Sequence, residues 1–165
     1  LSTAIGVLPG NADLSGLRYG KICILADADS DGLHIATLLC ALFLRHYKPL
    51  VQEGRIYISM PPLYRIDCGK DVLYALDNDQ RDQIVNDFKK RKGKPKINIQ
   101  RFKGLGEMNP SQLRETVMDP ATRQLVNLSI TSSDNANSMM DLLLSKKNAP
   151  ARKEWLEKKG SLAKI

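Results

Sequence analysis

Lys21-Ile-Cys-Ile-Leu-Ala-Asp27-Ala-Asp29-Ser-Asp31-Gly32 is the stretch that decides the fold, because an apolar run ends there in three carboxylates at alternate positions. So much negative charge in five residues calls for a cation. Hard carboxylate oxygens select Mg²⁺ or Ca²⁺ over softer metals. Asp27, Asp29 and Asp31 are therefore predicted to be metal ligands.

The acidic turn also partly matches three different kinds of local structure. Asp-x-Asp-x-Asp-Gly matches the start of an EF-hand calcium loop, but Leu38 occupies the twelfth position, where that loop needs a glutamate. One aspartate suffices for a helix N-cap, so capping alone leaves two acids without a role. A phosphatase-type site stays open, with Asp27 as nucleophile and Asp29 as general acid and base.

The residues around the acidic turn predict an α/β unit. Ile22 to Ala26 is a short apolar strand, His34 to Tyr47 is a long apolar helical stretch, and Arg55 to Met60 is a second strand. Lys21 to Met60 is therefore predicted to form a βαβ unit. The acids would lie at the carboxyl edge of its parallel sheet, where open α/β folds place their sites.

The remaining sequence predicts an α+β region, so we divide the chain into residues 1–65 and residues 66–165. The strands predicted in the second region are Val72 to Leu76, Ile97 to Phe102 and Arg123 to Ile130. The helices predicted there are Asn78 to Lys92, Pro110 to Val117, Asn135 to Lys147 and Arg152 to Lys159.

The charge balance favours a nucleic-acid partner, since 25 Lys and Arg face 18 Asp and Glu, for a net charge of +7. Basic residues cluster at Lys89–Lys94, at Lys146-Lys147 and at Lys158-Lys159. Three widely spaced cysteines suggest neither a disulfide framework nor a zinc site. The apolar stretch Ile35 to Leu44 is too short to cross a bilayer, so we expect no membrane association and a cytoplasmic location.

Three segments carry a family resemblance. Tyr19 to Leu39 is similar to the Toprim metal motif of the type IIA DNA topoisomerases, and Pro61-Pro-Leu-Tyr-Arg65 and Gln100-Arg-Phe-Lys-Gly-Leu-Gly-Glu-Met-Asn-Pro110 resemble two further signatures. Their order and spacing agree with the family's B subunits, and the likeness extends almost end to end. The amino-acid sequence of the first motif is more similar to the topoisomerase IV branch than to the gyrase branch. The gyrase branch remains the alternative within the family.

The resemblance implies a Toprim Rossmann-like parallel sheet with flanking helices in residues 1–65, followed by an α+β tail in residues 66–165. Asp27 and Asp29 would hold the catalytic Mg²⁺, and Asp31 matches the third acid of the motif. In the family, this ion supports cleavage of a DNA duplex by a tyrosine of the A subunit. No tyrosine of this chain is expected to be that nucleophile.

The resemblance also implies partners and an activity. His34, Lys103 and Arg152 would contact double-stranded DNA. Two A and two B subunits would form a heterotetramer that decatenates and relaxes DNA, with ATP bound by a region outside this chain. A Mg²⁺-dependent phosphohydrolase and a non-catalytic DNA-binding module are the alternatives from other classes.

One departure from the family pattern limits these expectations. The family uses a glutamate from an earlier Toprim strand, in a Glu-Gly-Asp type motif, and this chain has no match to that motif. The chain also begins at Leu1 rather than at a methionine. We therefore expect a fragment that neither cleaves DNA nor hydrolyses ATP by itself.

Overall fold

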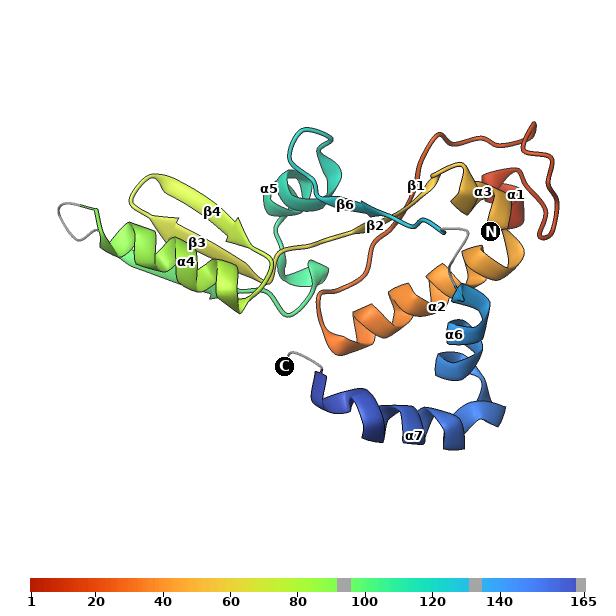
Figure 1. Ribbon diagram of the computed structural model, residues 1–165. Coiled ribbons are helices and arrows are strands. Elements are labelled where there is room, and N and C mark those ends of the chain that lie inside the picture. Colours follow the sequence, from red (N-terminus) through yellow and green to blue (C-terminus); the bar gives the residue numbers. More distant parts are fainter. Residues whose placement is uncertain (92–95, 131–134, 163–165) are drawn as a thin grey trace.

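Two three-stranded sheets and their helices make up the mixed α/β fold of the computed structural model, which describes residues 1–91, 96–130 and 135–162 (Figure 1). Sheet A has the strand order β1-β2-β6, and sheet B has the order β4-β3-β5. Figure 1 shows sheet B with helix α4 at one end of the molecule and helices α1, α2 and α3 around the other end.

Sheet A contains the predicted βαβ unit. Strand β1 (Ile22–Ile24) leads through α2 (Ser30–His46) and α3 (Lys48–Gln52) to β2 (Ile56–Ser59). Strands β1 and β2 are parallel, which confirms that prediction. Strand β6 (Leu125–Asn127) then pairs antiparallel with β2, so the sheet is mixed rather than wholly parallel.

Helix α2 begins four residues before the predicted start at His34. Its N-cap is Asp29, whose side chain accepts a hydrogen bond from the backbone N–H of Gly32, and this cap fixes the start at Ser30. The helix buries its residues at a spacing that defines one face, and that face packs on sheet A. The buried core here consists of Ile5, Val7, Ile24, Ala36, Cys40, Phe43, Leu44, Tyr47, Leu50, Val51 and Ile56.

Sheet B forms a smaller unit with its own core. Strands β3 (Tyr64–Cys68), β4 (Asp71–Ala75) and β5 (Ile97–Arg101) are antiparallel, and α4 (Asn78–Lys89) packs on them through the buried Phe88. The central strand β3 was not predicted, although its burial alternates as expected for a half-buried strand. Helix α4 starts where predicted, after the N-cap Asp77.

Shorter elements connect and follow the two sheets. They are α1 (Ser2–Ile5), η1 (Leu105–Glu107), α5 (Pro110–Leu113), η2 (Arg114–Met118), α6 (Ala136–Leu144), η3 (Lys146–Asn148), α7 (Ala149–Lys159) and η4 (Gly160–Leu162). The helix predicted for Pro110 to Val117 is α-helical only to Leu113 and continues as the π-helical turn η2. The strand predicted for Arg123 to Ile130 is shorter, since only three of its residues pair with β2.

Two further predictions, the division into two regions and the absence of a membrane span, can be compared with the structure. Strand β6 belongs to the second predicted region, residues 66–165, and yet it completes sheet A of the first. The basic cluster at Lys89–Lys94 lies partly outside the described residues. Among the described helices, none is long and apolar enough to span a membrane.

Candidate functional site

The three predicted metal ligands surround the junction of β1 and α2. Asp27, Asp29 and Asp31 are all exposed, and together with Leu105 they line one open hollow of about 390 Å³. The structure therefore brings all three acids to a single surface, at the carboxyl end of β1 where the sequence predicted them.

A distant loop closes on Asp27. The backbone N–H of Leu105 donates a hydrogen bond to Oδ1 of Asp27 over 2.8 Å. Gly104 precedes it in extended conformation and lies so close that a Cβ there would be 2.8 Å from Oδ2 of Asp27. The sequence motif around Gly104 is thus part of the site, because its backbone orients the first carboxylate.

The second carboxylate is held by the helix it caps. Oδ1 of Asp29 accepts a hydrogen bond from the backbone N–H of Gly32 over 2.7 Å. Gly32 also packs directly on the acidic turn, since a Cβ there would lie 2.1 Å from the carbonyl oxygen of Asp27. A glycine at this position lets the helix start against the end of β1.

The donor set suits a hard cation that keeps much of its water. In residues 1–91, 96–130 and 135–162, no group of three or more His, Cys, Asp and Glu side chains lies close enough together to hold a metal ion. Mg²⁺ is usually held through one or two carboxylates and several waters, so it needs no such cage. Asp27 and Asp29 each use Oδ1 for a backbone N–H, and in the described part of the chain their Oδ2 atoms accept no hydrogen bond. Asp27 and Asp29 therefore fit Mg²⁺ as a pair of carboxylate ligands, whereas Asp31 does not join them in a three-residue metal site.

Two of the predicted DNA contacts lie beside this hollow along the chain. His34 is the fifth residue of α2 and is exposed, three residues after Asp31 and so on the same side of the helix. Lys103 is exposed and immediately precedes Gly104; its backbone N–H donates to the Glu107 carboxylate over 2.8 Å. Both side chains are thus free to reach a polyanion at the site.

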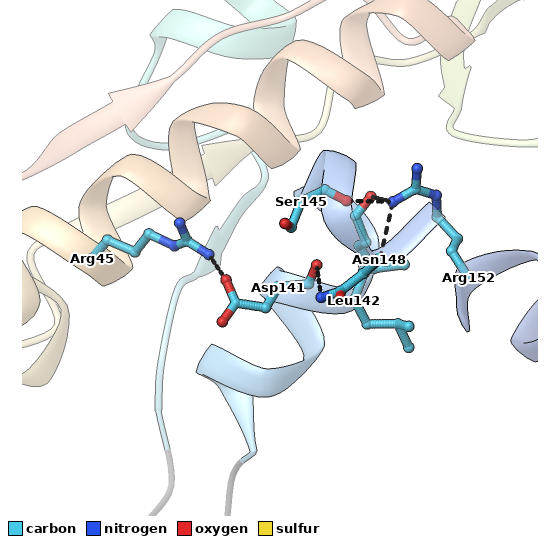
Figure 2. A network of polar contacts seen from close by, with 7 residues as sticks. Arg45, Asp141, Leu142, Ser145, Asn148 and Arg152 are labelled. Atoms are coloured by element: carbon cyan, nitrogen blue, oxygen red, sulfur yellow. Dashed lines mark hydrogen bonds and ion pairs between the residues drawn. The ribbon is translucent and has the colours of Figure 1, made fainter. Parts of the chain in front are cut away.

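The third predicted DNA contact, Arg152, has a structural role. Figure 2 shows its Nη1 turned toward the carboxyl end of α6, where it donates to the carbonyl oxygens of Leu142 (3.0 Å), Leu143 (2.9 Å) and Ser145 (3.4 Å). Helix C-termini leave such carbonyls without intrahelical partners. Arg152 therefore caps α6 and fixes α7 against it, and its contact with DNA stays a prediction.

The capped helix pair is joined to the helix that carries the acids. Arg45, near the end of α2, forms an ion pair with Asp141 of α6 (Figure 2). The Nδ2 group of Asn148 donates to the carbonyl oxygen of Asp141 over 2.9 Å, which ties the α6–α7 corner to the same residue. Because the Arg45–Asp141 pair is exposed, it positions α6 more than it stabilises the fold.

The part that the Gln100–Pro110 segment plays in the site was not predicted from the sequence. Its glycines suggest a loop that presents backbone N–H groups to phosphate, or else a tight turn. In the structure, the N–H of Leu105 is directed to a carboxylate of the same chain. The two glycines that flank Leu105 were the available signal, but nothing local in the sequence identifies Asp27 as the acceptor.

Comparison with known proteins identifies the family of the chain. Residues 94–157 match the family model described as the carboxyl terminus of the DNA gyrase B subunit. Over its whole length, the chain is 62% identical to the B subunit of DNA topoisomerase 4 from Pseudomonas aeruginosa and 59% identical to that from Escherichia coli K12. It is 45% identical to the B subunit of DNA gyrase from Thermotoga maritima, over 88% of this chain and 22% of that protein.

The chain belongs to the family of B subunits of the bacterial type II DNA topoisomerases. It spans about a quarter of the length of the topoisomerase relatives it matches, 26% in the two topoisomerase 4 examples. Within the family, it is more similar to these topoisomerase 4 proteins than to the Thermotoga gyrase protein.

Proposed function

We propose that this chain is the Mg²⁺-binding Toprim part of a topoisomerase IV B subunit, which supports double-strand cleavage, passage and religation of DNA. One observation carries the proposal: Asp27, Asp29 and Asp31 line a single hollow in a chain that is 62% identical to a topoisomerase 4 B subunit. The protein would work in the cytoplasm, with the A subunit in an A₂B₂ assembly and with ATP bound by another part of the B subunit.

The proposal gives different residues of the site different roles. Asp27 and Asp29 would hold the ion, while the N–H groups of Leu105 and Gly32 keep their carboxylates oriented. When bound, Mg²⁺ supplies Lewis-acid stabilisation of negative charge on the scissile phosphate. The amino terminus of α2 lies at the same place and favours negative charge, which suits a phosphate held beside the cation.

Exposed basic side chains would hold the duplex. His34 follows Asp31 by three residues, and Lys103 precedes the Gly104–Leu105 loop that contacts Asp27, so these two exposed residues are the proposed phosphate contacts near the ion. Contacts of this kind tolerate any sequence and weaken with salt. Arg152 is the third proposed contact, through the guanidinium nitrogens that do not cap α6.

Decatenation by the whole B subunit containing this chain tests the proposal, with its A subunit, ATP and Mg²⁺ present. Asp29→Asn should abolish decatenation and leave ATP hydrolysis intact, because asparagine keeps the helix cap but loses the charge. Glu53→Gln is the matched control, since Glu53 lies outside the hollow and pairs with Arg55. Decatenation unchanged by Asp29→Asn would overturn the metal assignment.

The phosphohydrolase alternative predicts hydrolysis of a phosphate ester by this chain. It needs Oδ2 of Asp27, which accepts no hydrogen bond in the described part of the chain, to attack a phosphate, with Asp29 as general acid and base. Turnover of p-nitrophenyl phosphate with Mg²⁺, abolished by Asp27→Asn, would favour that alternative. We expect no such turnover.

A further inference from the structure

A second cavity lies away from the acids, between sheet B and the turn η2. It has a volume of about 370 Å³ and shares no lining residue with the hollow around Asp27. Val72, Tyr74 and Leu76 line one wall, because alternate residues of a strand face the same side. Cavities of this size accommodate small organic molecules.

The opposite wall is formed by a π-helical turn. Such turns are rare and are frequently found at functional sites. In η2, the turn carries Glu115 and Thr116 into the cavity wall. Its backbone is anchored on both sides, since Thr116 Oγ1 donates to the carbonyl of Gln112 and Thr122 Oγ1 donates to the carbonyl of Glu115.

One carboxylate in this cavity, that of Glu115, forms no ion pair with the described residues. The hydroxyl of Tyr74 donates to Oε2 of Glu115 over 3.2 Å. Burial and the Glu115 carboxylate raise the pKa of Tyr74, so the hydroxyl stays a donor at neutral pH. Among the described residues, no Lys, Arg or His nitrogen lies within 4.0 Å of the Glu115 carboxylate. Arg65, on the same face of sheet B, pairs with Asp67, and the more distant Glu115 charge contributes only a smaller part of the rise in the Arg65 pKa.

We propose that this cavity binds a small amphipathic cation, an apolar body that carries a primary amine. The apolar body would lie against Met60, Val72 and Leu76, and the ammonium would donate to the free oxygen of Glu115. The Tyr74 ring in the wall would add attraction for the cation. A neutral molecule of the same shape would bury the same surface but could not donate a charge-assisted hydrogen bond to Glu115.

Titration of the full chain with 2-phenylethylamine tests the proposal, followed by ¹³C-methyl NMR. Saturable shifts are expected at the methyl groups of Met60, Val72 and Leu76. Glu115→Gln should weaken binding about tenfold, because a charge-assisted hydrogen bond becomes a neutral one. Glu53→Gln is the matched control and should leave the affinity unchanged. Neutral 2-phenylethanol should bind at least about tenfold more weakly than the amine.

Val72→Trp provides an independent variant that fills the cavity. Val72 is already 41% exposed on β4, so a larger strand-favouring side chain should be tolerated while amine binding is lost. The methyl spectrum of each variant in the absence of amine reports whether that variant is folded. The proposal is overturned by equal affinity for amine and alcohol, by shifts confined to other methyl groups, or by no saturable shift up to about 10 mM amine.

Discussion

The backbone N–H of Leu105 donates a hydrogen bond to Oδ1 of Asp27 over 2.8 Å, although 78 residues separate the two in sequence. This bond joins the acidic turn after β1 to the loop that enters η1. The position of the first carboxylate therefore depends on a loop from the other half of the chain. A substitution in that loop should therefore shift the Asp27 side chain, although it replaces no residue of the acidic turn.

Gly104→Ala tests this dependence. The backbone at Gly104 is extended and would accept alanine, so the expected effect is steric: the new Cβ would lie 2.8 Å from Oδ2 of Asp27. The carboxylate or the loop must shift, which weakens the Leu105 hydrogen bond. We expect hydrogen exchange of the Leu105 amide to accelerate about tenfold, as for loss of a bond to a charged acceptor.

Gly106→Ala is the control for the same loop, because nothing lies within 4 Å of a Cβ at Gly106. In the Gly106→Ala variant, the hydrogen-exchange rate of the Leu105 amide should match that of the wild type within about twofold. Equal exchange in the Gly104 and Gly106 variants would contradict the proposed contact between loop and carboxylate.

Gly32→Ala should destabilise the fold although alanine is the better helix former. A Cβ at Gly32 would lie 2.1 Å from the backbone oxygen of Asp27, and backbone cannot move aside cheaply. The expected cost is about 2 kcal/mol of unfolding free energy, or about 4–8 °C in Tm. Gly160→Ala, where a Cβ meets no atom of the described residues within 4 Å, should melt within about 1 °C of the wild type. Similar melting of both variants would argue against the close approach.

The parts of the fold that the sequence predicted are those with strong local patterns. The βαβ unit followed from apolar runs of strand and helix length on either side of the acidic turn, and β1 and β2 are parallel as predicted. Helix α4 was predicted to start at Asn78 and does so after its Asp77 cap. In the same way, the alternation of acids placed three carboxylates at one end of β1, where the structure has them.

The features that the sequence did not reveal depend on distant partners. Strand β3 (Tyr64–Cys68) is short and half polar, and only its pairing with both β4 and β5 makes it central. Strand β6 has three residues, each of which pairs with a residue of β2. The bond between Leu105 and Asp27 is equally non-local, so no window of sequence around either residue could predict it.

Asp29 has two roles that substitutions can separate. Asp29→Ala removes the cap of α2 and should cost about 1 kcal/mol of unfolding free energy. Asp29→Asn keeps a capping oxygen and should melt within about 0.5 kcal/mol of the wild type. Thermal unfolding of the chain without Mg²⁺ measures both. Equal losses in the two variants would mean that charge, rather than the cap, stabilises the start of the helix.

Arg152→Ala should loosen the α6–α7 corner in the absence of DNA. The substitution leaves the carbonyls of Leu142, Leu143 and Ser145 without their donor, and we expect about 1.5 kcal/mol lower stability and reduced helicity by circular dichroism. Lys153→Ala is the control on the same helix, because Lys153 makes only an exposed contact of 3.8 Å with Glu157. Unchanged melting of Arg152→Ala would show that the cap contributes nothing.

Tyr74→Phe should change how stability depends on alkaline pH. Burial, followed by the hydrogen bond with Glu115, raises the folded-state pKa of Tyr74 above its ordinary value of 10.0. The unfolded state therefore releases the Tyr74 proton at a lower pH than the folded state does. For this reason, the contribution of Tyr74 to the free energy of unfolding is complete below pH 10 and is lost as the pH rises toward the folded-state pKa. At pH 8, the wild type should be about 1 kcal/mol more stable than Tyr74→Phe, because it keeps the hydrogen bond. Urea unfolding at pH 8 and at pH 11 should show that this difference narrows. A difference that stays constant over this range would mean that folding leaves the ionisation of Tyr74 unchanged.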